Sequence, residues 1–159
     1  SLHDALPILK TKKAGIEEIV TFENPINACW QNFNPTNNNV ANGSFSGYLN
    51  PDVVYGLTYK NKDLPLLTSH SRTLLVTSCF FAKEVVDFEV VTTITADGRN
   101  FYYKSYNLKK IIRKINSWEE VTLLFQLPKI ETKDYEFALY IWNTGKTECY
   151  YDDFAFRIY

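Results

Sequence analysis

The sequence predicts an all-β protein folded as a sandwich of two antiparallel sheets. Short apolar or alternating runs are separated by turn signals along the chain, and no segment has the length and period of a long helix. Aromatic residues make up 16% of the 159 residues, which favours strands over helices. Many short strands with turns between them are typical of a β-sandwich.

The last hairpin, 135–159, shows the clearest alternation. The inner face of its first arm carries Phe137, Leu139 and Ile141, and the other face carries Ala138, Tyr140 and Trp142. The return arm continues the inner face with Phe154, Phe156 and Ile158. The turn between the arms contains Gly145, which can adopt the positive φ that such turns need.

Asp152 is the most informative single residue of this hairpin. By its parity with Phe154 it faces the core at the start of the return arm. An unpaired buried charge is very costly, so this carboxylate needs a cation or several hydrogen-bond donors.

Seven further strands are expected, at 17–23, 45–50, 53–59, 72–82, 85–96, 101–106 and 118–127. Val121, Leu123 and Phe125 alternate inward in the last of these and join the predicted core. Asn42-Gly43 is a strong turn signal, which is the preferred interpretation although Asn42 also begins a glycosylation sequon. Residues 97–100 form a hairpin turn, and 107–115 is the only segment with helical spacing, expected to pack on the sandwich as a crossover.

The chain is expected to be one domain, residues 14–159, preceded by a non-native or disordered segment, residues 1–13. The first eight residues, SLHDALPI, resemble translated adapter sequence and contain no signal peptide. The net charge of -1 gives no electrostatic footprint for nucleic acid, and no apolar run is long enough to span a membrane. The three cysteines, Cys29, Cys79 and Cys149, are too widely spaced for a metal ribbon and are expected to be small core residues.

Several segments together resemble galactose-binding-like jelly rolls that serve as carbohydrate-binding modules, especially those in exported proteins of Bacteroidetes-type bacteria. The segments are FENP with Trp30, ANGSFSG at 41–47, YYKSYNL at 102–108, SWEEVTLLFQLP at 117–128 and YIWNTGKTECYYDDF at 140–154. The resemblance covers residues 17–159. It implies a jelly-roll β-sandwich and an extracytoplasmic location, whereas a scaffold alone says little about the ligand.

The resemblance also implies a structural Ca²⁺ between the first and last strands. Its ligands would be Glu23, Asp152 and backbone carbonyls of the loop near 43–46. Calcium prefers such carboxylate and carbonyl oxygens on flexible loops. The alternative is that Asp152 accepts hydrogen bonds from backbone amides and that Glu23 is solvated.

A sugar-binding surface is expected on the face opposite the core. Flat aromatic rings for C–H faces and planar polar groups for hydroxyls are needed there. The predicted ligand-binding residues are Glu89, Tyr102, Tyr103, Gln126, Tyr140 and Trp142, with Asp87, Thr93 and Thr122 beside them. The alternative is that the 107–115 crossover covers these rings as a second small core. Trp30 and Trp118 are expected to be structural.

Catalysis has little support in the sequence. His3 and His70 are isolated, and the adjacent carboxylate pairs would point to opposite faces of their strands. We therefore expect a non-catalytic carbohydrate-binding-module-like domain, at the C-terminus of a larger exported or membrane-anchored bacterial protein, with a glycan as partner. The alternative is a structural or protein-interaction β-sandwich without sugar binding.

Overall fold

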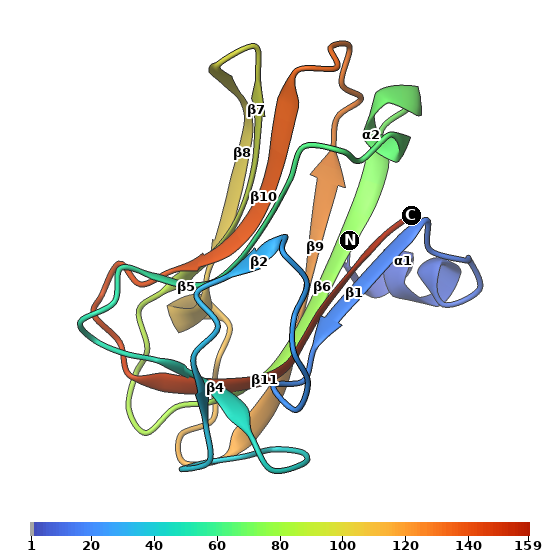
Figure 1. Ribbon diagram of the computed structural model, residues 1–159. Helices are drawn as coiled ribbons and strands as arrows, with labels where there is room; N and C mark the ends of the chain where they lie inside the picture. Colours follow the sequence, from blue (N-terminus) through green and yellow to red (C-terminus); the bar gives the residue numbers. More distant parts are fainter. Residues whose placement is uncertain (1) are drawn as a thin grey trace.

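Two antiparallel sheets pack face to face in the computed structural model, which describes residues 2–159 (Figure 1). In sheet A the strand order is β3 (Pro35–Thr36), β4 (Ser46–Leu49), β11 (Cys149–Ile158), β6 (Arg72–Phe81) and β9 (Trp118–Leu127). Strand β1 (Ile16–Val20) pairs with the second half of β11. In sheet B the order is β2 (Trp30–Gln31), β5 (Tyr55–Asn61), β10 (Tyr135–Trp142), β7 (Glu89–Ala96) and β8 (Arg99–Asn107). The predicted jelly-roll sandwich is confirmed.

The core lies between the two sheets and contains the residues that alternation predicts. Phe125 is 1% exposed, and all the other predicted core residues are buried: Val121, Leu123, Phe137, Leu139, Ile141, Phe154 and Phe156. Trp30 is also buried, with its indole N–H donating to Glu18 Oε2 at 3.2 Å. Trp118 is half-buried against Phe81, with ring centroids 5.7 Å apart. Both tryptophans therefore have packing roles.

Strand ends differ from the predicted ones at several places. The first strand ends at Val20 and not at Glu23, because the backbone turns at Phe22, whose φ is 65°. The turn between β7 and β8 is formed by Asp97 and Gly98, with φ values of 50° and 71°, the positive pair of a tight hairpin turn. The turn before β11 has its positive φ at Lys146, not at Gly145. Gly145 is needed for a different reason: a Cβ there would lie 2.5 Å from Cβ of Asp87.

Three short helical segments accompany the sheets. Helix α1 (Leu2–Leu9) occupies much of the segment that the sequence predicts to be non-native or disordered, and the non-native origin of this segment stays a prediction. Helix α2 (Leu66–Ser69) lies in the connection between β5 and β6. In the 107–115 crossover only Leu108–Lys110 is helical, as a 3₁₀ turn. None of the described helices is long and apolar enough to cross a membrane.

A β-bulge in β11 corrects the predicted orientation of Asp152. Tyr151 pairs with Phe80 and is buried in the core, so Asp152, the next residue, pairs with Cys79 on the opposite face. The register against β6 then shifts between Asp152 and Ala155, and Phe154 turns back into the core. Asp152 is buried, at 0% exposure, but under a loop on the outer side of sheet A and not between the sheets.

The three cysteines are free thiols. Cys149 is buried as expected, whereas Cys29 and Cys79 are only partly buried. Cys79 lies on the outer face of sheet A opposite Asp152, which corrects the expectation that it is a core residue.

Candidate functional site

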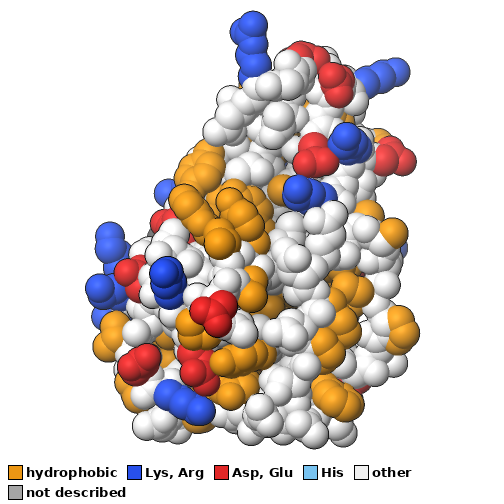
Figure 2. Space-filling view, turned by 60° about the vertical axis from the view of Figure 1, so that its left-hand side comes forward, with side chains coloured by type: hydrophobic (Ala, Val, Ile, Leu, Met, Phe, Trp, Pro, Cys, Tyr) orange, Lys and Arg blue, Asp and Glu red, His pale blue; other side chains and the backbone are white. Residues whose placement is uncertain are grey.

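A groove of about 410 Å³ crosses the outer face of sheet B. Strands β5, β7 and β10 form most of it, and β2 with the residue after it closes one end. The lining residues are Gln31, Asn32, Tyr55, Thr58, Lys60, Thr93, Thr95, Glu136, Ala138 and Tyr140. Figure 2 brings the sheet B side of Figure 1 forward and shows hydrophobic side chains gathered in the middle of the surface, with charged ones mostly at the top and left.

Cross-strand register explains why these side chains gather. Lys60, Ala138, Thr93 and Tyr103 are successive partners on four neighbouring strands. Directly paired residues share a face of the sheet, so this row crosses the strands at right angles. Ala138 and Thr93 are small, and they form a low floor between larger neighbours.

One wall of the groove is aromatic. Tyr55 and Tyr140 meet edge to face, with centroids 5.8 Å apart and planes at 78°. Tyr140 is partly buried, and burial, followed by the nearby Tyr103, Tyr55 and Glu89, raises the pKa of its hydroxyl. The ring is neutral at pH 7 and keeps an O–H that can donate to a ligand. Such a partly buried ring with a polar tip suits a sugar, which has apolar C–H faces and hydroxyl edges.

The opposite side of the groove is polar. Lys60, Glu136 and Thr95 supply an ammonium, a carboxylate and a hydroxyl. Thr58 Oγ1 already donates to Gly56 O at 2.9 Å, so its remaining hydrogen-bonding capacity is as an acceptor. The groove therefore combines stacking surface with several donors and acceptors on a preformed sheet.

Four of the predicted ligand-binding residues lie on this outer face. Tyr140 lines the groove, and Tyr103, which is 47% exposed, stands beside Thr93 at its β8 end. Trp142 and Glu89 are paired one row beyond the groove, and Glu89 accepts a hydrogen bond from Ser105 Oγ at 3.2 Å. These four residues therefore lie at or beside one wall and one end of the groove, and their role in ligand binding stays a prediction.

Tyr102 and Gln126 do not belong to this surface. Tyr102 is adjacent to Tyr103 in a strand, so it points to the other face and packs against the core. Gln126 is on β9 in sheet A, where its Oε1 accepts a hydrogen bond from Thr73 Oγ1 at 3.2 Å. Asp87 and Thr122 also lie elsewhere: Asp87 anchors the loop at Gly145, and Thr122 is on β9.

The 107–115 crossover does not cover the groove. None of its residues is among the lining residues. Instead Leu108 and Ile112 are buried in the main core, and the backbone N–H of Leu108 donates to Phe88 O at 2.9 Å. The crossover therefore runs from β8 of sheet B to β9 of sheet A, and Tyr140 and Trp142 keep partial solvent access.

Sequence reasoning missed the β2 and β5 contributions to the groove. Tyr55 and Thr58 are three residues apart, a spacing that does not indicate a shared strand face. A register shift near Tyr140 brings both onto it. The only available signal was composition, because 55–60 contains two Tyr, one Thr and one Lys.

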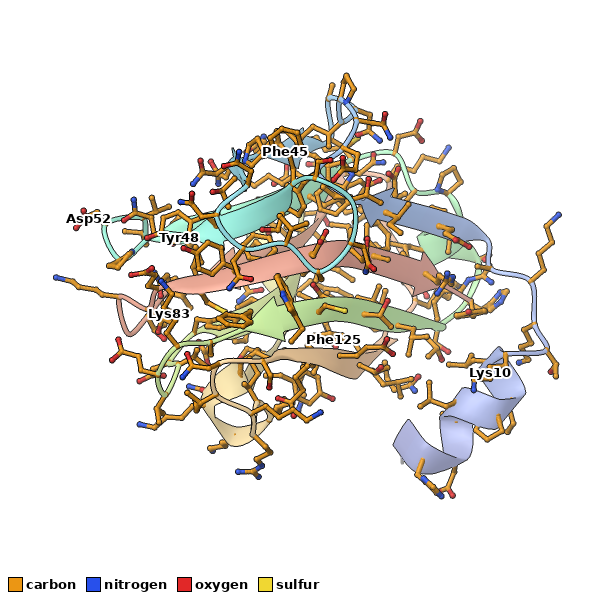
Figure 3. The ribbon with its side chains drawn as sticks, turned by 90° about the horizontal axis from the view of Figure 1, so that it is seen from below. Lys10, Phe45, Tyr48, Asp52, Lys83 and Phe125 are labelled. Carbon is orange, nitrogen blue, oxygen red and sulfur yellow. The ribbon has the colours of Figure 1, made fainter. Side chains whose placement is uncertain are left out.

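The two carboxylates predicted to bind metal hold one loop between them. Backbone N–H groups of Ala41 and Asn42 donate to Asp152 Oδ2 at 3.2 and 3.1 Å. Those of Ser44 and Phe45 donate to Glu23 Oε1, both at 2.8 Å. Seen from below, the loop with Phe45 lies over β11 (Figure 3). Gly43, between the two pairs of amides, has a φ of 74° and lies directly against the Glu23 carboxylate.

These contacts match the expected alternative, an Asp152 held by backbone amides. Its Oδ1 also accepts from the N–H of Asp153 at 2.8 Å, so three amides face the carboxylate. Amide N–H groups are not metal ligands, and the described residues contain no group of three or more His, Cys, Asp or Glu arranged for a metal ion. Calcium therefore stays a prediction. Burial raises the pKa of Asp152, against the opposing effect of its amide partners.

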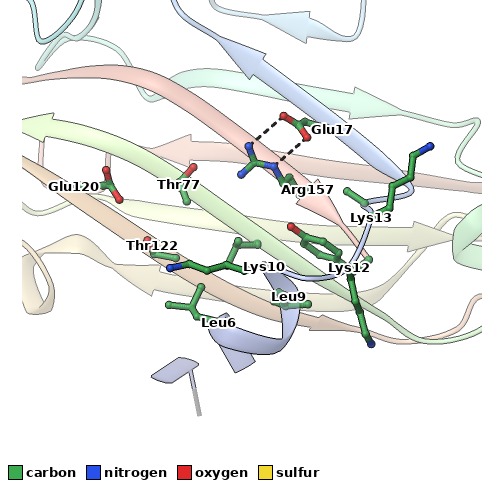
Figure 4. A pocket seen from close by; sticks show the side chains of 13 residues that line it. Leu6, Leu9, Lys10, Lys12, Lys13, Glu17, Thr77, Glu120, Thr122 and Arg157 are labelled. Atoms are coloured by element: carbon green, nitrogen blue, oxygen red, sulfur yellow. Dashed lines mark hydrogen bonds and ion pairs between the residues drawn. The ribbon is translucent and has the colours of Figure 1, made fainter. Parts of the chain in front are cut away.

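A further hollow of about 550 Å³ lies between α1 and the outer face of sheet A (Figure 4). Lys10, Lys12 and Lys13 line it, while Arg157 is paired with Glu17 at 3.1 Å. Much of its wall comes from residues 6–14, which include part of the segment predicted to be non-native.

Comparison with known proteins supports the fold. No family model matches the sequence, and no curated protein matches it. Among solved structures, the xylan-binding domain CBM22-1 of Paenibacillus barcinonensis Xyn10C has a TM-score of 0.61 at 13% identity, covering 93% of this chain and 97% of that one. The C-terminal family 22 carbohydrate-binding module of Clostridium thermocellum Xyn10B has a TM-score of 0.52 at 12% identity, with coverage of 88% and 92%. An enzymatically active domain of a tailspike protein of bacteriophage CBA120 has a TM-score of 0.55 at 16% identity, covering 87% of this chain and 20% of that one. The chain thus has the β-sandwich fold of carbohydrate-binding modules, a scaffold that enzymes also carry.

Proposed function

We propose that this chain is a non-catalytic carbohydrate-binding domain that holds a glycan in the groove of sheet B. The observation that carries the proposal is the edge-to-face pair of Tyr55 and Tyr140 beside a floor of small residues, opposite Lys60 and Glu136. Rings supply stacking surface for sugar C–H faces, and the polar wall supplies hydroxyl partners.

The shape of the groove favours a polysaccharide chain over a single sugar. Its lining runs across β2, β5, β10 and β7, from Gln31 to Thr93, at right angles to the strands. Neighbouring strands are about 4.8 Å apart, so four strands offer room for several linked sugar rings. The CBM22-1 domain named above is described as xylan-binding, and so is a further neighbour, a family 22 domain with a TM-score of 0.53 at 12% identity, so xylan is the first glycan to test.

We infer the parent protein and the cellular compartment of the domain from the sequence resemblance to galactose-binding-like jelly rolls of exported bacterial proteins. A module of this kind would serve as the C-terminal accessory domain of a larger exported or membrane-anchored bacterial protein, in an extracytoplasmic compartment. The competing function, a structural or protein-interaction sandwich without sugar binding, predicts that the groove has no glycan ligand.

The test is a glycan array followed by titration of the glycans that bind. Tyr140→Ala should weaken binding at least severalfold, because one ring of the aromatic wall is lost. The matched control is Tyr48→Ala, which removes a half-buried tyrosine from the outer face of sheet A, where it packs on Tyr150. An array without any bound glycan, or equal losses from both variants, would favour the interaction-domain alternative.

A further inference from the structure

A second cleft, of about 800 Å³, lies at the open edge of the sandwich between β8 and β9. These two strands end their respective sheets. The inward row of β8, with Tyr102, Lys104 and Tyr106, forms one side of the cleft, and β9 forms the other. The remaining lining residues are Ala5, Ile111 and the stretch 122–126 of β9. We call this the edge cleft.

The aromatic part of the edge cleft is fixed before any ligand arrives. The Tyr106 hydroxyl donates to Leu124 O at 2.6 Å, which joins β8 to β9. Its ring packs edge to face on Phe125, with centroids 5.0 Å apart and planes at 77°. Because both the ring and the hydroxyl of Tyr106 are held, this side chain loses little conformational freedom when a ligand binds, which favours affinity.

The charge of the edge cleft is one-sided. Lys104 is the only charged residue among its lining residues, and its ammonium lies 5.3 Å from the centre of the Tyr106 ring. No carboxylate among the described residues lines the cleft, in contrast to the groove of sheet B, where Glu136 accompanies Lys60. Tyr102, Thr122 and Gln126 add neutral hydrogen-bonding groups.

We propose that the edge cleft is a second sugar site that takes a carboxylate-bearing sugar, a uronic acid unit of an acidic glycan. The C–H face of the sugar would lie against the tyrosine rings and its carboxylate would pair with Lys104. Thr122 and Gln126 also line the cleft and would supply hydrogen-bonding groups for sugar hydroxyls. This site is separate from the groove of sheet B and does not depend on glycan binding there.

The experiment uses a galacturonate trisaccharide and, as the uncharged probe, the corresponding galactose trisaccharide. Calorimetric titration gives the affinity, and amide NMR shifts locate the bound sugar. The acidic probe should shift signals of 102–106 and 122–126 and should bind more weakly as salt is added. Lys104→Gln should weaken it about fivefold, as expected for a partly exposed ion pair, and Lys104→Arg should restore much of the affinity.

The matched control is Lys62→Gln, which removes an exposed ammonium that lines neither the edge cleft nor the groove of sheet B and should leave the affinity for the acidic probe unchanged. Absence of binding up to millimolar concentration overturns the proposal. So do shifts confined to the groove of sheet B, equal affinity for the two probes, or a Lys104→Gln variant that binds as well as wild type. A failure here leaves the neutral-glycan array and its Tyr140→Ala result standing, so the two proposals fail separately.

Discussion

The backbone amide of Asn42 donates to the carboxylate of Asp152, 110 residues further along the chain, at 3.1 Å. The side chain of Asn42 also donates to Asp153 Oδ2 at 2.7 Å. One loop is thus held to the last strand at the point where that strand bulges. Because Glu23 holds the same loop from the other side, the beginning and the end of the domain are joined through it.

Asp152→Asn should therefore destabilise the fold. The asparagine side chain has only one oxygen, so its NH₂ group must face some of the backbone N–H donors that the carboxylate accepts from. Those buried donors lose their acceptor, which lowers the unfolding free energy by about 1–3 kcal/mol. Urea unfolding measures the loss. Asp153→Asn keeps an oxygen that can accept from Asn42 and is the control. Equal stability of wild type and Asp152→Asn would contradict the role of the carboxylate.

The same pair of proteins tests the pKa of Asp152. Its folded-state pKa is raised above the ordinary 3.8 by burial, so the folded state binds the proton more tightly than the unfolded state. The contribution of Asp152 to stability is then greatest at low pH and falls as pH rises from the unfolded pKa through the folded one. The difference in unfolding free energy between wild type and Asp152→Asn should narrow over this window. A difference that widens as pH rises would mean that the pKa is lowered.

Calcium is tested on the wild-type protein by melting with millimolar Ca²⁺ and with a chelator. A bound ion stabilises the folded state in proportion to RT ln(1 + [L]/Kd). A calcium site predicts a higher melting temperature with Ca²⁺ and no such rise in Asp152→Asn. The amide contacts described here predict superimposable curves.

Phe125→Ala should cost about 3–5 kcal/mol, since a large side chain is removed from a fully packed core. Phe125 is 1% exposed and supports the Tyr106 ring. Denaturant unfolding provides the measurement. A loss below about 1 kcal/mol would be too small for a core position of this sandwich.

Thr92→Val should leave the protein equally stable or raise its unfolding free energy by about 1 kcal/mol. Thr92 is 0% exposed, and its hydroxyl has no hydrogen-bond partner among the described residues. A methyl group of the same shape removes that unsatisfied group. Thr93→Val, on the solvent side of the same strand, is the control with little expected change. Destabilisation by Thr92→Val would reveal a partner for the hydroxyl.

Alternation along each strand was enough to predict the sheets and most of the core, because the predicted core residues of β9 and β10 obey the two-residue period. It failed at Asp152, where a bulge breaks the period, and at Tyr55 and Thr58, where a register shift aligns residues three apart. It also placed Gln126 on the wrong surface, since the sequence does not tell which sheet a strand belongs to. Tyr102 is in the same sheet as the groove, but its side chain points to the core face. Of the groove, Tyr140 was predicted, whereas Lys60 and Glu136 required cross-strand register.

The central claim is that the groove of sheet B holds a glycan, and filling its floor tests this most directly. Ala138 lies between Lys60 and Thr93 on the groove floor, so Ala138→Tyr should fill the groove without entering the core. Ala155→Tyr makes the same change on the outer face of sheet A, where Ala155 pairs with Ile19 and Thr77, and serves as the control. Titration with the best glycan from the array should show binding by wild type and Ala155→Tyr and none by Ala138→Tyr, with all three proteins folded. Undiminished binding by folded Ala138→Tyr would contradict the claim.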